Sequence, residues 1–175
     1  ECRRKKMSDF DMNVYMGTLI EEQFNAAFYD RKIKLGIGNS KNPSWVKRGI
    51  SPYKMYLADF FKKQKLNRAP KLQDELVKFR ALKNKISAII TTNYDTFLEQ
   101  EVFNKDFQVY VRQHELFSAD SYNIAEIYKI HGSATDAESI IITQDDYEHF
   151  RESRKLIIAK MLTLFAEAPI IFMVL

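Results

Sequence analysis

The sequence predicts an α/β fold: a parallel sheet with flanking helices, preceded by a helical N-terminal part. Up to about residue 83 the apolar residues recur at helical spacing. After that point, short apolar runs rich in β-branched residues alternate with helical stretches, which is typical of a parallel sheet covered on both faces. At 175 residues the chain suffices for one sizeable core and is short for two. We therefore expect a single domain over 1–175, with a helical part at about 8–83 and a sheet-forming part at about 84–175.

Three helices are predicted in the N-terminal part. The first spans 11–29, where apolar residues such as Tyr15, Met16 and Ile20 recur every three or four positions. The second begins after Ser51 and Pro52, a favourable N-cap and first-turn pair. The third covers about 70–82, where apolar residues again recur at helical spacing.

The second half is predicted to alternate strands with helices. Helices are expected at 96–103 and from about 144 through 165. The predicted strands are short and apolar, and they lie at 86–92, 107–111, 125–130, 139–143 and from Ile170 onward. The apolar run from Pro169 to Leu175 is predicted to be a central strand of the sheet, although the sequence stops with this run. At the other end, six residues precede Met7, so we expect that the sequence does not begin at a natural start. We therefore expect the chain to be cut at both ends.

Composition narrows the function classes. The 27 basic and 23 acidic residues leave a net charge of +4 that is spread along the chain, which argues against a nucleic-acid binder. The single cysteine, Cys2, excludes an internal disulfide and a cysteine-based zinc site. The three histidines lack the regular spacing of a helix-borne metal site, so no metal is predicted. No apolar run approaches membrane-spanning length, and we expect a cytoplasmic protein that does not bind membranes.

Polar motifs follow two of the predicted strands. Asn93 and Asp95 come directly after the strand at 86–92, and His131 with Gly132 ends the strand at 125–130. Alone, the first motif is most often a helix cap or turn, and a single histidine at a strand end is more often structural. Because the carboxyl ends of parallel strands meet at one edge of a sheet, where ligands bind, the pair together favours a functional site.

At these motifs the sequence resembles the sirtuin-like domains of bacterial antiphage defence proteins. The resemblance covers about 51–173 and rests on three motifs in order: Thr91-Thr92-Asn93-Tyr94-Asp95, Lys129-Ile130-His131-Gly132-Ser133 and Ile142-Thr143-Gln144-Asp145-Asp146-Tyr147. It implies a Rossmann-like sheet that binds NAD as its substrate, with Asn93 and His131 as catalytic residues. The residues expected to contact NAD are Thr91, Thr92, Tyr94, Asp95, Gly132 and Ser133. For Asp145-Asp146-Tyr147 we favour helix N-capping and packing over a functional role.

The chain departs from the family pattern in two places. Family members begin with a strand and a glycine-rich loop that cradles the NAD phosphates, whereas here a helix comes first. The segment 35–40 has two glycines but follows a helix, so we do not assign it to that loop. The family also continues past the strand at 170–173 with a glycine and a serine, whereas this chain reads Val174-Leu175. We therefore expect the isolated chain to bind NAD weakly and to hydrolyse it slowly or not at all.

Three functions remain open at this point. The resemblance favours hydrolysis of NAD to nicotinamide and ADP-ribose by a defence effector, which we expect to be a homo-oligomer acting with further domains or partner proteins. The alternatives are an NAD-dependent protein deacylase and a non-catalytic NAD-binding or assembly module of a larger protein. For the hydrolytic function, Asn93 would hold the ribose or the attacking water, and neutral His131 would accept a proton.

Overall fold

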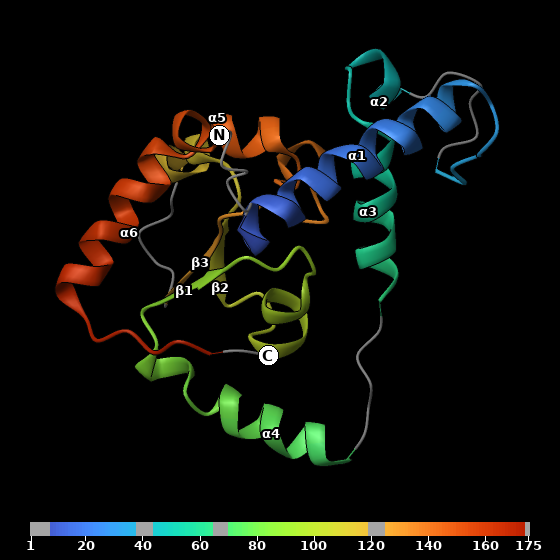
Figure 1. The fold of residues 1–175 in the computed structure, drawn as a ribbon. Coiled ribbons are helices and arrows are strands. Elements are labelled where there is room, and N and C mark those ends of the chain that lie inside the picture. The colour runs from blue at the N-terminus through green and yellow to red at the C-terminus, as the bar shows by residue number, and fades with distance from the viewer. Residues whose placement is uncertain (1–7, 38–43, 65–69, 119–124, 174–175) are drawn as a thin grey trace.

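Figure 1 presents the computed structural model of the protein, which describes residues 8–37, 44–64, 70–118 and 125–173. The N-terminal part contains four helices in the described residues: α1 (Asp9–Tyr29), α2 (Ser44–Lys47), α3 (Pro52–Lys63) and α4 (Pro70–Arg80). The second part contains the strands β1 (Ala88–Thr91), β2 (Phe107–Tyr110) and β3 (Ala125–Lys129), and the helices α5 (Gln144–Ser153) and α6 (Lys155–Glu167). Short helical turns η1 (Lys83–Lys85), η2 (Leu98–Val102), η3 (Gln113–Ser118) and η4 (Ala137–Ser139) lie between them.

The three predicted N-terminal helices are confirmed. The hydroxyl of Ser8 caps α1 by accepting a hydrogen bond from the N–H of Asp11, and Ser51 caps α3 ahead of Pro52 at its first turn. Figure 1 shows α1 crossing α3, and the two helices are in contact. The short helix α2 was not predicted, because four residues are too few for a helical period to be visible.

The parallel sheet is also confirmed, as an α/β, Rossmann-like arrangement with strand order β1-β3-β2. Strand β3 lies in the centre and pairs in parallel with both neighbours, so that Ile127 stands beside Ile89 on one side and Val109 on the other. All three strands consist mainly of apolar or aromatic residues, as expected for strands buried on both faces.

Helices cover both faces of the sheet. On one face, Ile127 of β3 packs with Leu76 of α4 and Val102 of η2. On the other face, Tyr110 and Tyr128 pack against Ile157 of α6. A third cluster, around Trp45 and Ile140, joins the N-terminal helices to η4. At the carboxyl edge of the sheet, the loops that follow β1 and β3 contact α3 and α5, through the ring pairs Tyr94–Phe61 and His131–Tyr147.

Some predicted elements are wrong or only partly right. Residues 139–143 are not a strand, because Ile140 and Ile142 pack with the N-terminal helices instead of the sheet. The helix predicted over 96–103 is a short π-helix, η2. The helix predicted from 144 through 165 is divided at Arg154 into α5 and α6.

The predicted terminal strand is wrong as well. Residues 170–173 form no strand, and Ile171 and Phe172 are 84% and 89% exposed. An apolar run becomes a buried strand only where neighbouring strands pair with it, and among the described residues none pairs with this one. Val174 and Leu175 lie outside the described residues.

The surface of α1 also departs from the simple helical pattern. Tyr15, Met16 and Ile20 are exposed, whereas Gly17 is buried. A Cβ atom at Gly17 would lie 2.4 Å from the carbonyl oxygen of Ile142, so the glycine lets α1 approach the chain just ahead of α5. Within the part of the chain that the structure describes, no helix is long and apolar enough to cross a membrane.

Candidate functional site

A cavity of about 340 Å³ opens at the carboxyl edge of the sheet. This volume is at the small end of the range of roughly 300–1,000 Å³ typical of ligand sites. Thr91 at the end of β1 pairs with Lys129 at the end of β3, so the loops that follow these strands leave the sheet side by side. The residues that line the cavity come from these two loops and from α3, and they are Phe61, Thr92, Asn93, Tyr94, Asp95 and His131.

Hydrogen bonds to the sheet and to η2 hold the loop that carries Asn93. The N–H of Asn93 donates to the hydroxyl of Thr91 at 3.1 Å, and Asp95 Oδ1 accepts from the N–H of Phe97 at 2.9 Å. From β3, the buried Nζ of Lys129 donates to the carbonyl oxygen of Asp95 and forms an ion pair with Glu99 at 2.9 Å. Among the described residues the Asn93 side chain has no hydrogen-bond partner and is exposed, so its amide is available to a ligand.

Aromatic rings of α5 hold the half-buried imidazole of His131. The edge-to-face ring contacts place Tyr147 at 5.6 Å and Phe150 at 6.1 Å from the imidazole centroid. The carbonyl oxygen of His131 accepts a hydrogen bond from the N–H of Ile141 at 2.9 Å. Burial, and then the positive charge of Arg154, lower the pKa of His131 below its ordinary value. The imidazole is therefore neutral at physiological pH and able to accept a proton.

An aromatic pair forms one wall of the cavity. The rings of Phe61 and Tyr94 meet edge to face with centroids 5.4 Å apart. The hydroxyl of Tyr94 donates to the carbonyl oxygen of Ile141 at 2.7 Å, and burial raises its pKa. Because Tyr94 is fixed at both its ring and its hydroxyl, it joins α3 to the chain segment that also binds the backbone of His131.

Three residues that the sequence placed at the site do not line the cavity. Thr91 lies beneath it and accepts the hydrogen bond from Asn93. Gly132 has a φ of +95°, and a Cβ there would lie 2.2 Å from the carbonyl oxygen of Ser139. Ser133 is 1% exposed, and its N–H donates to the hydroxyl of Ser139 at 3.0 Å. Thr91 thus supports the loop that carries Asn93, whereas Gly132 and Ser133 shape the turn that carries His131.

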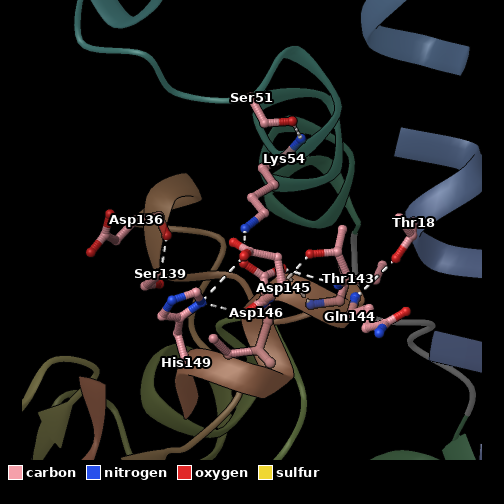
Figure 2. A network of polar contacts seen from close by, with 12 residues as sticks. Thr18, Ser51, Lys54, Asp136, Ser139, Thr143, Gln144, Asp145, Asp146 and His149 are labelled. Carbon is pink, nitrogen blue, oxygen red and sulfur yellow. Dashed lines mark hydrogen bonds and ion pairs between the residues drawn. The ribbon is translucent and has the colours of Figure 1, made fainter. Parts of the chain in front are cut away.

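The third sequence motif forms the start of α5, as the N-capping interpretation predicts. Thr143 and Asp146 make a capping box, in which Asp146 Oδ2 accepts from the N–H groups of Ile142 and Thr143, each at 3.0 Å. Figure 2 shows Lys54 of α3 reaching Asp146, with which it forms an ion pair. The motif thereby fixes α5, and with it Tyr147, beside His131.

Sequence reasoning missed Phe61, Phe150 and Arg154. Phe61 was assigned only to a helix, and nothing local indicates that its helix ends over the cavity. The three-residue spacing of Tyr147 and Phe150 was a usable signal, because it places both rings on one face of a helix.

The described residues differ in what they offer to a cofactor or a metal. The cavity lining includes no lysine or arginine. Within the described ranges, no three potential metal-ligating side chains of His, Cys, Asp or Glu lie together. Of the glycine-bearing segment 35–40, residues 38–40 lie outside the described residues, and a Cβ added to Gly36 would meet no heavy atom within 4 Å.

Comparison with known proteins identifies the part of the chain that holds this site. No curated protein matches the sequence. A family model, described as the SIR2-like domain, matches residues 87–173. The match begins just before β1 and includes both cavity loops and α5 and α6. Residues 87–173 are therefore similar to the SIR2-like domain, which implies use of NAD.

Proposed function

We propose that the protein, at the full length its gene encodes, binds NAD at the cavity and hydrolyses it to nicotinamide and ADP-ribose, as an effector of antiphage defence. The observation that supports this best is that Asn93 and His131 line one cavity, from adjacent parallel strands, within the segment that matches the SIR2-like domain. The defence role rests on the resemblance of the three motifs alone. Homo-oligomerisation and defence partners remain predictions.

The two residues suit the chemistry of nicotinamide release. As the bond from the ribose carbon to the nicotinamide nitrogen breaks, its electron pair neutralises the positive ring nitrogen, and the sugar gains oxocarbenium character. Water then bonds to that carbon and loses one proton, so NAD and water give nicotinamide, ADP-ribose and a proton. The free amide of Asn93 would orient the ribose or the water, and neutral His131 would take the proton.

The cavity fits the nicotinamide-ribose half of NAD better than the whole molecule. The rings of Phe61 and Tyr94 offer an apolar wall to the nicotinamide, and the carboxylate of Asp95 can accept hydrogen bonds from ribose hydroxyls. Thr92 adds a hydroxyl at the rim. Because no cation lines the cavity, the residues that would bind the diphosphate lie elsewhere.

The direct test measures nicotinamide release from NAD by the protein at the full length its gene encodes. We expect His131→Ala and Asn93→Ala each to lower the rate by at least about 100-fold, the lower limit typical of removing a general base. Both residues lie on loops outside the packed clusters, so we expect the variants to keep the fold. Undiminished release by both folded variants would place the chemistry elsewhere.

Matched controls and a second substrate separate the alternatives. His149→Ala and Asn84→Ala change the same residue types at exposed positions that do not line the cavity, and they should retain full activity. A deacylase would release nicotinamide only when an acetyl-lysine peptide is added. A non-catalytic module would release none in either reaction, although NAD would still raise its thermal stability.

A further inference from the structure

A buried arginine lies beside the turn that carries His131, where α5 ends and α6 begins. Arg154 is 4% exposed and has a φ of −128° and a ψ of 15°, so the helical path breaks at this residue. Its Nη2 donates to the carbonyl oxygen of Ser139 at 3.0 Å, and its Nε donates to that of Ile130 at 3.4 Å. The break in the helix therefore coincides with a side chain that points inward.

The two carbonyl groups lie on either side of the turn that carries His131. Ile130 follows β3 and directly precedes His131, and the carbonyl of Ser139 lies against Gly132, where no Cβ would fit. Two residues beyond Ser139, the N–H of Ile141 donates to the carbonyl of His131. The guanidinium of Arg154 thus binds the chain on both sides of the His131 turn, at Ile130 and at Ser139.

We propose that Arg154 is a positioning residue for His131: it clamps the turn between β3 and residues 139–141 and holds a fixed positive charge behind the imidazole. The clamp and the fixed charge are properties of the fold and do not depend on NAD. The role of Arg154 in catalysis, which is to keep the proton acceptor His131 neutral, rests on the proposed function.

The positive charge of Arg154 is not neutralised by an ion pair with a described residue. Of the nearby carboxylates, Asp136 is paired with Arg112, and Glu115 accepts hydrogen bonds from the N–H groups of Val111 and Arg112; among the described residues none forms an ion pair with Arg154. A buried guanidinium bound only to carbonyl oxygens keeps its full charge, because arginine is protonated at any physiological pH. Among the described residues, Arg154 is accordingly the one charged residue that, after burial, lowers the pKa of His131.

Other ionisable groups on the elements around His131 do not replace this effect. On the helical side Asp146 is paired with Lys54, and on the sheet side Lys129 is paired with Glu99. Tyr147 and Tyr94 are neutral, because burial raises the pKa of both. Asp95 also lines the cavity; a carboxylate favours a protonated imidazole, so it cannot be the cause of the lowered pKa of His131.

The experiment is an NMR titration of the three histidines in the protein without NAD, with His131→Asn identifying the His131 signals. The variants are Arg154→Met, which removes the charge, and Arg154→Lys, which keeps it. Arg151→Met is the matched control, because Arg151 is exposed on α5. We expect His131 to titrate at a higher pH in Arg154→Met than in the wild type, and at an unchanged, low pH in the lysine variant and the control.

Two results would overturn the inference. One is a folded Arg154→Met variant in which His131 titrates as in the wild type. The other needs no variant: in the wild type, His131 must titrate below the exposed His149, whose pKa is raised by the backbone and charge of Asp145. The opposite order would refute the fixed charge even if Arg154→Met did not fold.

Activity gives an independent measure. If the chain hydrolyses NAD, the rate should fall on the acidic side as His131 becomes protonated, and this fall should move to higher pH in Arg154→Met. A merely structural role would lower the rate equally at all pH values and leave the profile in place. Since the titration needs no NAD, a protein that fails to hydrolyse NAD would refute the proposed function without touching the inference about Arg154.

Discussion

Gly132 illustrates how one missing side chain positions the candidate site. Its φ of +95° lies in the region that favours glycine, and its Cα packs directly on the backbone of Ser139 and Ile140. The turn after β3 can therefore close tightly, which places His131 at the cavity and brings the carbonyl of Ser139 within reach of Arg154.

Gly132→Ala should destabilise the fold by at least about 2 kcal/mol, because it adds both backbone strain and a clash with Ser139. The free energy of unfolding, measured in urea, checks this. Gly36→Ala is the matched control: it has open space around its Cβ position and no positive φ, so it should be neutral or slightly stabilising. Equal effects of the two substitutions would contradict the packing described for Gly132.

At single residues, sequence reasoning found the polar groups of the site but not their surroundings. Asn93 and His131 could be placed at one edge because parallel strands end together, which follows from the strand pattern alone. Ser133 and Gly132 lie next to His131 in sequence, yet a turn directs them behind the cavity. Phe61 and Arg154 come from distant elements, and their positions depend on packing that no local pattern encodes.

At the level of the elements, a single side chain, Asp146, both caps α5 and links it to α3. Asp146 closes the capping box at the start of α5 and is also the partner of Lys54 on α3. The two side chains are only 13% and 12% exposed, so the pair is largely removed from solvent. Through this residue, the helix that carries Tyr147 and the helix that carries Phe61 are tied together on the helical side of the cavity.

Asp146→Asn should cost on the order of 3 kcal/mol of unfolding free energy at neutral pH, because it leaves Lys54 without its counter-ion in a poorly hydrated place. Asp145→Asn, at an 82% exposed side chain, is the matched control and should change stability by less than about 0.5 kcal/mol. Denaturant unfolding of the two variants makes the comparison. A small effect at both positions would mean that the pair does not hold α5.

Because of the ion pair between Asp146 and Lys54, we expect the free energy of unfolding to depend on pH. Burial alone would raise the pKa of Asp146, but the hydrogen bond from Lys54 and those from the N–H groups of Ile142 and Thr143 outweigh it and hold the pKa below its usual value. A lowered folded-state pKa contributes stability that is present above the unfolded-state pKa and is lost as pH falls through the folded-state pKa. The stability gap between wild type and Asp146→Asn should therefore narrow in acid.

Elements with strong periodicity were predictable, and those defined by tertiary contacts were not. The helices α1, α3 and α4 and all three strands of the sheet follow from spacing and capping residues. The run at 139–143 is equally rich in isoleucine, but its burial is provided by the N-terminal helices, so it has no need of strand pairing. The division at Arg154 follows from hydrogen bonds to carbonyl groups far away in sequence.

Across the whole molecule, an apolar residue is buried only where another element is positioned to cover it. One face of the sheet is covered by α4 and η2, and the other face is covered by α6 and η3. The apolar run at 170–173 resembles a buried strand in composition alone and lies exposed after α6. Composition thus predicts how much apolar surface the chain carries, whereas topology decides which part of it becomes core.

The difference between a covered and an uncovered apolar residue can be measured by making the same substitution, isoleucine to alanine, at two positions. Ile157→Ala should cost about 2–5 kcal/mol, because Ile157 is fully buried between α6 and the sheet. Ile171→Ala should change the unfolding free energy by less than about 0.5 kcal/mol, because that side chain is 84% exposed. A comparable loss at Ile171 would show that 170–173 is packed in solution.

The strand order has a consequence for how the protein is made. β3 is the last of the three strands to leave the ribosome, yet it is the central one, and β1 and β2 do not pair with each other. While the chain is growing, β1 and β2 therefore lack the strand with which both pair, and their unpaired backbone groups and apolar side chains stay open to other chains. The sheet can assemble only once residues 125–129 have emerged, and its contacts then span long stretches of sequence, which favours slow folding. Translation speed between β2 and β3, and chaperones that shield unpaired strands, should accordingly govern the yield of folded protein.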